Sequence, residues 1–211
     1  MQLGQKEERR YQLYQYSGYE QYKKIQVACN KEKLTAGQWV VKKNIAFLSE
    51  YLKKRIHHKL SFGICHGTRS GVEQKWFREY LPDCRVIGTE ISDTAKQFPF
   101  TIEWDFHHVK LKWLRSVDFI YSNAFDHSYD PERCFVSWMS CIRPGGICII
   151  EHSSGHENIT EMDPFGAHIK NMPYLIEQWS NGRYRVHEII QAPVKSPNLK
   201  YLCFIIIKKF N

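Results

Sequence analysis

Residues 60–73 read LSFGICHGTRSGVE, an apolar run that enters a glycine-containing turn and continues into an amphipathic stretch. Short apolar runs are typical of buried strands, and glycine permits the sharp turn that leads from a strand into a helix. A turn that holds Gly67 and Gly71 can present backbone N–H groups and the positive end of a helix to a ligand. Because the spacing departs from GxGxxG, a tight turn without a ligand remains an alternative.

Apolar runs and amphipathic stretches alternate through the rest of the chain. The later apolar runs include RVIGTEI, VDFIYSN and GGICIIEH, and the amphipathic stretches include GVEQKWFREYL and PERCFVSWMSCI. This alternation predicts a parallel sheet with helices on both faces. The last two runs, YRVHEII and YLCFIIIKK, are separated by QAPVKSPNLK, which is too short for a crossover helix, so they form an antiparallel hairpin. We therefore predict a Rossmann-like α/β fold, doubly wound, with a mostly parallel seven-stranded sheet, a C-terminal antiparallel hairpin and N-terminal helices.

The N-terminal segment differs from this alternating region. Residues 19–29 and 36–57 carry apolar side chains at helical spacing, which predicts two helices. Residues 1–18 are polar and rich in tyrosine, and we expect them to be loosely held. We find no internal repeat or long linker, so we expect a single folded unit made of a basic helical extension, residues 1–58, and a Rossmann-like core, residues 59–211.

The net charge of +8 comes from the N-terminal part of the chain. Residues 1–60 hold 13 Lys and Arg against 5 Asp and Glu, and the remaining residues hold 17 of each kind. This excess could attract an anionic substrate, a nucleic acid or an acidic lipid surface. Because the basic residues are spaced along the helices, a solvated helix face is the simpler explanation.

The sequence shows no feature of a membrane or secreted protein. No apolar run approaches the roughly 18 residues that span a bilayer, and the first residues lack the apolar core of a signal peptide. The seven cysteines form no CxxC pair, and several lie in apolar strand-like runs. We expect a cytoplasmic protein without a membrane partner and with reduced, buried cysteines, of which only Cys65 in the glycine turn could touch a ligand.

Acidic residues end the second and third predicted strands. Glu90 ends RVIGTEI, 19 residues after Gly71, where a carboxylate in a Rossmann-like fold accepts hydrogen bonds from ribose hydroxyls. Asp105 follows a short strand in TIEWDFHHV and could accept a hydrogen bond from the amine of adenine, with Trp104 and Phe106 stacking beside it. A surface glutamate and a helix-capping aspartate are the plainer alternatives.

The ends of the fourth and fifth predicted strands are rich in polar residues. The fourth strand, VDFIYSN, is followed by Asn123, Asp126, His127 and Asp130, at the edge where open α/β sheets bind ligands. An Arg-Pro-Gly-Gly turn then leads into the fifth strand, which ends in Glu151, His152 and His156. Two adjoining strand ends with carboxylates and imidazoles are also compatible with a metal, but the spacing does not show that they converge, so we predict no metal.

Together these features resemble the class I S-adenosylmethionine-dependent methyltransferase family over residues 60–208. The resemblance implies S-adenosylmethionine as the cofactor, with Gly67 and its neighbouring backbone at the methionine moiety, Glu90 at the ribose, Asp105 at the adenine and Asn123 near the sulfonium. The expected cofactor-binding residues are Cys65, His66, Gly67, Thr68, Gly71, Glu90, Ile91, Asp105, Phe106, Asn123 and Ala124.

The glycine turn departs from the family pattern at three positions. The family has an acid at the position of Gly63 and glycines at the positions of Cys65 and Arg69. The family's contacts at those three positions do not carry over directly, and His66 and Arg69 inherit no role from the family.

Methyl transfer from a sulfonium is an in-line displacement, so a base is needed only for an acceptor that carries a proton. Histidine is suited to this role because its pKa is near neutrality. His127 is the first candidate for the catalytic base and His152 is the second, with an ordinary hydrogen-bonded loop histidine as the alternative for each.

The acceptor is expected to be a small polar molecule, such as a hydroxyl or carboxylate of a sugar or natural-product intermediate. Family members that methylate nucleobases often carry an Asp/Asn-Pro-Pro-aromatic tetrad after the fourth strand, where this chain has Ser122-Asn123-Ala124-Phe125. Two alternatives remain: an RNA methyltransferase whose basic helices bind phosphates, and a Rossmann-like binding domain without catalytic activity. A nicotinamide-dependent oxidoreductase is disfavoured because its third glycine spacing is absent.

Overall fold

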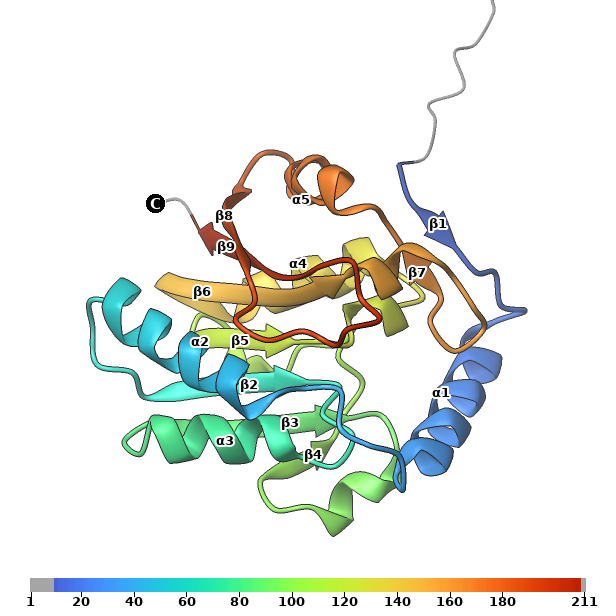
Figure 1. Cartoon of the computed structure of the whole chain (residues 1–211), viewed down its shortest axis with the longest axis horizontal. Helices are drawn as coiled ribbons and strands as arrows, with labels where there is room; N and C mark the ends of the chain where they lie inside the picture. Colours follow the sequence, from blue (N-terminus) through green and yellow to red (C-terminus); the bar gives the residue numbers. More distant parts are fainter. Residues whose placement is uncertain (1–9, 210–211) are drawn as a thin grey trace, which may run out of the picture.

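The computed structural model describes residues 10–209 and has a seven-stranded sheet at its centre (Figure 1). The strands are β2 (Phe62–His66), β3 (Arg85–Glu90), β4 (Thr101–Glu103), β5 (Val117–Ser122), β6 (Ile142–Ser153), β8 (Tyr184–Gln191) and β9 (Leu202–Lys209). Their order across the sheet is β4-β3-β2-β5-β6-β9-β8. The strands from β4 to β6 are parallel, and β9 runs antiparallel to both β6 and β8. The predicted fold, including the C-terminal hairpin, is confirmed.

Helices cover both faces of this sheet. The α-helices are α1 (Tyr19–Lys33), α2 (Lys42–Arg55), α3 (Val72–Tyr80), α4 (Pro131–Cys141) and α5 (Met172–Trp179). The short 3-10 helices are η1 (Asp93–Gln97), η2 (Leu111–Trp113), η3 (Phe125–His127), η4 (Ser154–Glu157) and η5 (Ile169–Asn171). Side chains of α2 and α3 share one apolar core with the sheet, and side chains of α4 and α5 share the other. Helix α1 instead stands beside the carboxyl ends of the parallel strands (Figure 1).

Helix α2, from the predicted N-terminal extension, packs on the sheet as one of the layers of the fold. Ile45, Leu48 and Leu52 of α2 are fully buried in the same core cluster as Phe77 of α3 and Phe204 of β9. A helix that buries its apolar face this way is stabilised mainly by tertiary packing. On this basis we propose that residues 10–209 fold as one unit, with α2 as an integral layer of it.

The expectation that the start of the chain is loosely held is wrong for residues 10–18. Strand β1 (Gln12–Leu13) pairs antiparallel with β7 (Phe165–Gly166), and the Tyr14 N–H donates to the Pro164 carbonyl at 2.8 Å. The Tyr11 ring also packs against Phe165, with 5.7 Å between ring centroids. A two-residue strand is too short to show a sequence pattern, and residues 1–9 lie outside the described residues.

The cysteines agree with their expected burial. All seven cysteines are free and buried, in keeping with reduced core residues. Within residues 10–209, no helix combines the length and the apolar character that crossing a membrane requires.

A buried carboxylate anchors the beginnings of the central strands. Asp118 of β5 is 0% exposed and accepts hydrogen bonds from the backbone N–H groups of Ser61, at 2.6 Å, and Phe62, at 2.7 Å. Its other oxygen lies 2.7 Å from His58 Nε2 and 3.2 Å from Arg143 Nη1. Burial would raise the pKa of Asp118, but these hydrogen bonds outweigh burial and lower it.

We expect Asp118→Ala to lower the free energy of unfolding by about 3 kcal/mol or more, because it leaves buried N–H groups without an acceptor and Arg143 without its partner. Urea denaturation at neutral pH measures this loss, and Asp83→Ala, at an exposed position between α3 and β3, is the matched control. Equal stability of the two variants would contradict the anchoring role.

The same carboxylate gives a pH dependence. Because the folded-state pKa of Asp118 is lowered, its stabilisation is present above the unfolded-state pKa of about 4 and is lost as the pH falls through the folded-state pKa. The stability difference between the wild type and Asp118→Ala should therefore shrink in urea titrations carried out below about pH 4.

Candidate active site

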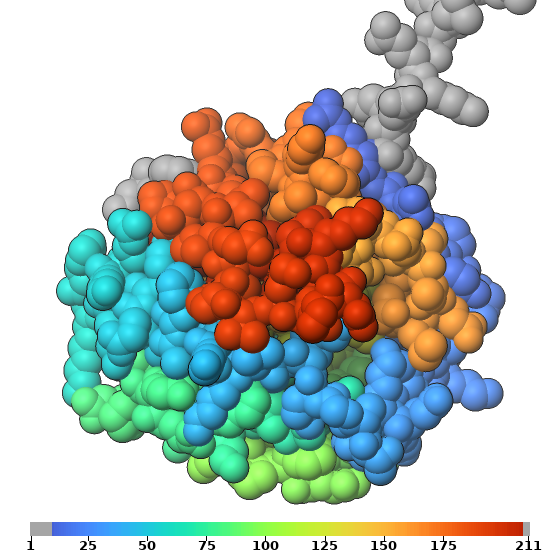
Figure 2. Space-filling model, in the orientation of Figure 1, coloured from blue at the N-terminus to red at the C-terminus, as the bar shows by residue number. Residues whose placement is uncertain are grey.

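A cavity of about 610 Å³ lies over the carboxyl ends of the parallel strands, within the range of small-molecule sites. Its floor comes from the turns after β2, β3, β5 and β6, and its cover comes from α1 and residues 36–39. The lining residues include Gln26, Cys29, Asn30, Lys33, Trp39, Gly67, Arg69, Glu73, Glu90, Phe106, Asn123, Ala124, Asp126, His127, His156 and Asp163. Figure 2 shows the surface hollowed between the blue N-terminal segment and the orange and red C-terminal half.

The glycine turn reaches the cavity at Gly67. The backbone of Gly67 is left-handed, with φ of 69°, and a Cβ there would lie 2.6 Å from the Ala124 Cβ. Glycine is therefore required both by the conformation and by the close approach of the two loops. The N–H groups of Gly67 and Thr68 donate to the Thr89 carbonyl at 2.9 and 3.0 Å. In this structure the first two N–H groups of the turn are used to fix it to β3.

Glu90 is held directly beside this turn. Its side chain lines the cavity, is 6% exposed, and accepts the Arg69 N–H at 3.0 Å and the Ser92 N–H at 3.2 Å. Burial raises its pKa, while these backbone donors oppose the rise. The structure thus brings the predicted ribose carboxylate and the glycine turn together.

Asp105 lies at a second, smaller cavity of about 200 Å³, which Ile91 also lines. Its carboxylate accepts a hydrogen bond from the Tyr19 hydroxyl at 2.8 Å and is 2.7 Å from His107 Nδ1. Burial would raise its pKa, but the His107 hydrogen bonds lower it to about 2. Its expected contact with adenine remains a prediction, because α1 supplies its partner here through Tyr19.

The other predicted cofactor residues divide into two groups. Phe106, Asn123 and Ala124 line the main cavity. The remaining four, Cys65, His66, Thr68 and Gly71, do not line it. The first three of these are buried in the fold, and the left-handed Gly71, with φ of 76°, caps α3.

The His66 ring illustrates why these side chains turn away from the cavity. It stacks on Trp138 with 4.9 Å between centroids, and its Nδ1 lies 2.8 Å from the Thr89 hydroxyl. Burial lowers its pKa to about 3, so the ring is neutral. If Cys65, His66 or Thr68 contacts the cofactor, the contact comes from its backbone.

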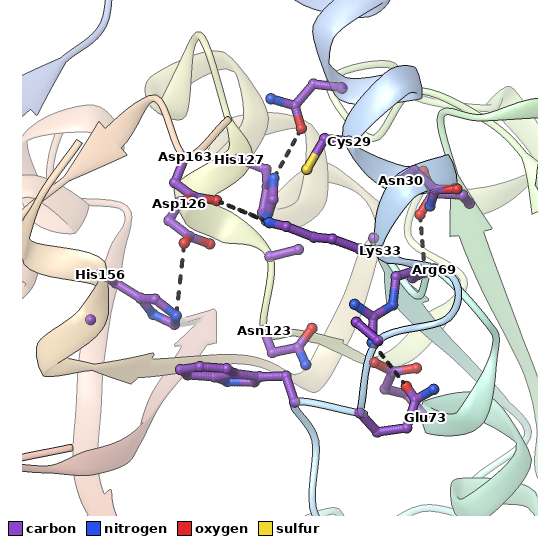
Figure 3. Close-up of a pocket in the computed structure, with 18 of the residues that line it drawn as sticks. Cys29, Asn30, Lys33, Arg69, Glu73, Asn123, Asp126, His127, His156 and Asp163 are labelled. Atoms are coloured by element: carbon purple, nitrogen blue, oxygen red, sulfur yellow. Dashed lines mark hydrogen bonds and ion pairs between the residues drawn. The ribbon is translucent and has the colours of Figure 1, made fainter. Parts of the chain in front are cut away.

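Four titratable side chains gather at one end of the cavity (Figure 3). They are Asp126 and His127 from η3, His156 from η4 and Asp163 from the loop before β7. His127 Nε2 lies 3.4 Å from Asp163 Oδ1, and His156 Nε2 lies 3.8 Å from Asp126 Oδ2. Lys33 of α1 completes this polar end, 3.9 Å from Asp163.

The hydrogen bonds of His127 fix the position of its proton. Gln26 of α1 donates its amide N–H to the Met162 carbonyl at 2.8 Å, so its carbonyl oxygen is the atom that faces His127 Nδ1 at 2.9 Å. Nδ1 must therefore carry a proton, and in the neutral ring Nε2 is left without one although it faces the Asp163 carboxylate at 3.4 Å. The Asp163 carboxylate would stabilise a second proton on this ring, at Nε2.

In His156 the opposite ring nitrogen, Nε2, holds the proton. The Ser153 N–H donates to its Nδ1 at 3.3 Å, so in the neutral ring Nε2 carries the proton and faces Asp126. His152, the second candidate for the base, does not line the cavity and packs edge-on against His156, with 5.5 Å between centroids. Burial lowers the pKa of His152 to about 3, and its Nε2 has no hydrogen-bond partner.

The structure gathers only part of the possible metal-binding set. Within residues 10–209, Asp126, His127 and Asp163 offer ligand atoms that lie within 4.8 Å of one another. Asp130 is elsewhere, as the cap of α4, where it accepts the Arg133 N–H at 3.1 Å. Lys33 already supplies a positive partner to the Asp163 carboxylate, and His156 Nε2 lies 3.8 Å from the Asp126 carboxylate.

Several cavity residues were missing from the sequence prediction. Gln26 and Trp39 come from the N-terminal segment, Glu73 from inside α3, and Asp163 from a loop far from any predicted strand end. None of these positions carries a local signal, because tertiary packing brings them to the cavity. Arg69 had been noted only as a departure, and its guanidinium donates to the Gly37 carbonyl at 2.8 Å, joining the turn to the cover.

Comparison with known proteins agrees with this geometry. Residues 64–150 match the family model described as a methyltransferase domain. Residues 64–150 therefore form a methyltransferase domain, and the chain has the fold of the class I S-adenosylmethionine-dependent methyltransferases. The matched residues contain the glycine turn, Glu90 and the polar end of β5 in this methyltransferase.

Solved structures share the fold of this methyltransferase at low identity. The Burkholderia thailandensis 1,6-didemethyltoxoflavin-N1-methyltransferase, with 1,6-didemethyltoxoflavin and S-adenosylhomocysteine bound, gives a TM-score of 0.70 at 10% identity over 94% of this chain and 93% of that chain. A SAM-dependent methyltransferase from Leishmania major gives 0.64 at 12% identity, over 89% and 83% of the two chains. A chain from the complex of the Haloferax volcanii Trm112 methyltransferase activator with a putative methyltransferase gives 0.61 at 13%, over 92% and 99%. A comparison with curated proteins gives no match.

The residues at the cavity suit S-adenosylmethionine. Gly67 allows close approach along the floor, and the Glu90 carboxylate can accept from a sugar diol. One oxygen of Glu73 is buried without a hydrogen-bond partner beside the same cavity, as a site built for a polar ligand would leave it. We propose Gly67, Glu90, Phe106, Asn123 and Ala124 as the cofactor-binding residues of the methyltransferase.

We expect Glu90→Ala to weaken S-adenosylhomocysteine binding roughly 10- to 100-fold, because a charged hydrogen bond to the ribose contributes about 1.5–3 kcal/mol. Isothermal titration calorimetry measures the change. Glu132→Ala, in the first turn of α4 and outside the cavity, is the control and should bind as the wild type does. Unchanged affinity of a folded Glu90→Ala variant would contradict the ribose assignment.

Proposed function

We propose that this methyltransferase O-methylates a small polar molecule at a hydroxyl group, with His127 as the general base. The observation that carries the proposal is the placement of His127 at the polar end of a covered cavity. Gln26 holds a proton on Nδ1, and the Asp163 carboxylate, 3.4 Å from Nε2, stabilises a proton taken up there. A carboxylate acceptor, which carries no proton at neutral pH, would not use this base.

When bound, the cofactor supplies a methyl group on a sulfonium, which is transferred to a nucleophile by in-line displacement. His127 would take the proton of the acceptor hydroxyl at Nε2. Gln26 holds the other ring proton, and the Asp163 carboxylate at 3.4 Å stabilises the imidazolium that results. General base catalysis of this kind contributes typically 10²–10⁴-fold to the rate.

The cover of the cavity favours a small acceptor. Helix α1 and residues 36–39 lie across the cavity, and the Trp39 ring is 5.7 Å from the His156 ring at an interplanar angle of 33°. An acceptor that reaches His127 must fit beneath these segments, where it is shielded from water. The Burkholderia thailandensis enzyme, which shares the fold, is an N1-methyltransferase with the small molecule 1,6-didemethyltoxoflavin bound.

The RNA alternative receives less support from the N-terminal lysines. Five basic residues of this segment form ion pairs with acidic partners: Lys31 with Asp93, Lys33 with Asp163, Lys42 with Glu79, Lys53 with Glu50, and Arg55 with Glu188. Basic side chains that are already paired are less available to bind phosphates. These five basic residues therefore belong to a solvated helix surface on which the charges are paired.

The acceptor class is tested by supplying S-adenosylmethionine with a labelled methyl group to the purified protein, together with either a low-molecular-mass cell extract or total RNA. We expect label in the small-molecule fraction, in a product identified as a methyl ether by mass spectrometry and NMR. Label in RNA, with binding that weakens steeply as salt is added, would replace the proposal by the RNA alternative. Absence of heat on titration with S-adenosylhomocysteine would favour the inactive binding domain.

With the acceptor identified, we expect His127→Ala to lower kcat by about 100-fold or more while the Kd for S-adenosylhomocysteine changes by less than about threefold. His57→Ala, at an exposed position after α2, is the matched control. Steady-state kinetics and calorimetry on the same preparations supply both values. Similar losses in kcat and in cofactor affinity would remove His127 as the base.

A further inference from the structure

Two buried glutamates whose charges interact lie beside the cavity, and one of them, Glu73, lines it. Glu73, in the first turn of α3, is 5% exposed and lines the cavity, and Glu151, on β6, is 1% exposed. Glu73 Oε2 and Glu151 Oε1 are both buried without a hydrogen-bond partner. The second oxygen of Glu151 accepts the Tyr121 hydroxyl at 2.8 Å. Unpartnered carboxyl oxygens in an interior are costly, so this pair calls for a ligand.

The surroundings make each of these groups a weak acid. Burial raises the pKa of Glu73 to about 8, and the charge of Glu151 adds to the rise. Burial also raises the pKa of Glu151 to about 7, against the hydrogen bond from Tyr121. At neutral pH the pair therefore holds at least one proton when no cation is present.

Glu73 is placed for a cation inside the cavity. Figure 3 shows Glu73 and Arg69 on one side of the cavity, His127 and Asp163 on the other, and Asn123 between them. The Arg69 guanidinium donates outward, to the Gly37 carbonyl at 2.8 Å and to Gln38 Oε1 at 3.4 Å. The nearest basic group of the turn is thus directed at the cover. Its charge and a hydrogen bond with Asn123 lower the pKa of Glu73 less than burial raises it, and Oε2 stays without a partner.

The glycine turn itself offers no acid here. Residues 63–71 contain no Asp or Glu, and at Gly63 an added Cβ would lie 2.3 Å from the Phe119 ring. The Phe119 ring therefore occupies the space that a larger residue would need. An acidic group beside the turn comes instead from the helix that follows it, through Glu73.

We propose that Glu73, supported by Glu151 behind it, binds the α-ammonium group of the cofactor's methionine moiety. S-adenosylmethionine carries two cationic groups, this ammonium and the sulfonium, and the ammonium is the one that can donate hydrogen bonds to a carboxylate. On binding, the proton of Glu73 leaves for solvent and the ammonium takes its place beside the carboxylate. The proposal depends on the cofactor and is independent of the acceptor proposed above.

Calorimetry with three ligands separates the contribution of the ammonium group to binding from that of the sulfonium. S-adenosylhomocysteine keeps the ammonium and lacks the sulfonium, S-adenosylmethionine has both, and 5′-methylthioadenosine has neither. We expect Glu73→Gln to weaken S-adenosylhomocysteine and S-adenosylmethionine alike, roughly 10- to 100-fold, and to leave 5′-methylthioadenosine within about twofold of the wild type. Glu132→Gln, on α4, is the control and should bind all three ligands as the wild type does.

Three results would overturn the proposal. Equal weakening of 5′-methylthioadenosine would show a general packing role for Glu73, and unchanged affinity for S-adenosylhomocysteine would show no role. Weakening of S-adenosylmethionine alone would assign Glu73 to the sulfonium.

A second measurement needs no variant and guards against a Glu73→Gln protein that fails to fold. Calorimetry of the wild type near pH 7 in buffers of different ionisation enthalpy counts the protons released on binding. We expect S-adenosylhomocysteine to release a substantial fraction of one proton and 5′-methylthioadenosine to release almost none. Equal proton release by the two ligands would refute the assignment.

Discussion

The hydrogen bond from the Arg69 backbone N–H to the Glu90 carboxylate joins the ends of two parallel strands. Because β2 and β3 are adjacent and parallel, their carboxyl ends meet at one edge of the sheet, and this bond sets how the glycine turn lies against that edge. The two N–H groups that reach the Thr89 carbonyl fix the same turn from behind. The position of the cavity floor, and of Asn123 on the next strand, depends on this arrangement.

The two ends of the cavity differ in origin. The floor is built from strand ends that the sheet brings together, whereas the polar end joins η3, the loop before β7 and the cover. The Gln26 and His127 side chains are 101 positions apart in the sequence and meet because α1 stands across the strand ends. In the proposed arrangement the cofactor site belongs to the sheet and the acceptor site to its surroundings, so that each site can change separately.

Sequence reasoning succeeded where local pattern and sheet geometry act together. The mostly parallel sheet, the hairpin and the closeness of Glu90 to the glycine turn follow from alternating apolar runs and from the convergence of parallel strands. Side-chain direction was harder: His66 lies in the turn, but the alternation along β2 places its ring against Trp138. Asp163 and Trp39 could not be predicted as cavity residues, because contacts between distant parts of the chain position the loops and the cover segments. The partner that Tyr19 gives Asp105 was hidden for the same reason.

Gln26 serves two purposes at once, since it belongs to the cover and also sets which nitrogen of His127 holds the ring proton. If α1 swings aside to admit ligands, the imidazole loses the acceptor that fixes its tautomer, and either nitrogen can then carry the proton. In the proposed mechanism, His127 therefore has the tautomer that a base needs only while α1 covers the cavity. An enzyme built in this way exchanges its ligands while it is inert and becomes reactive in the same movement that expels water.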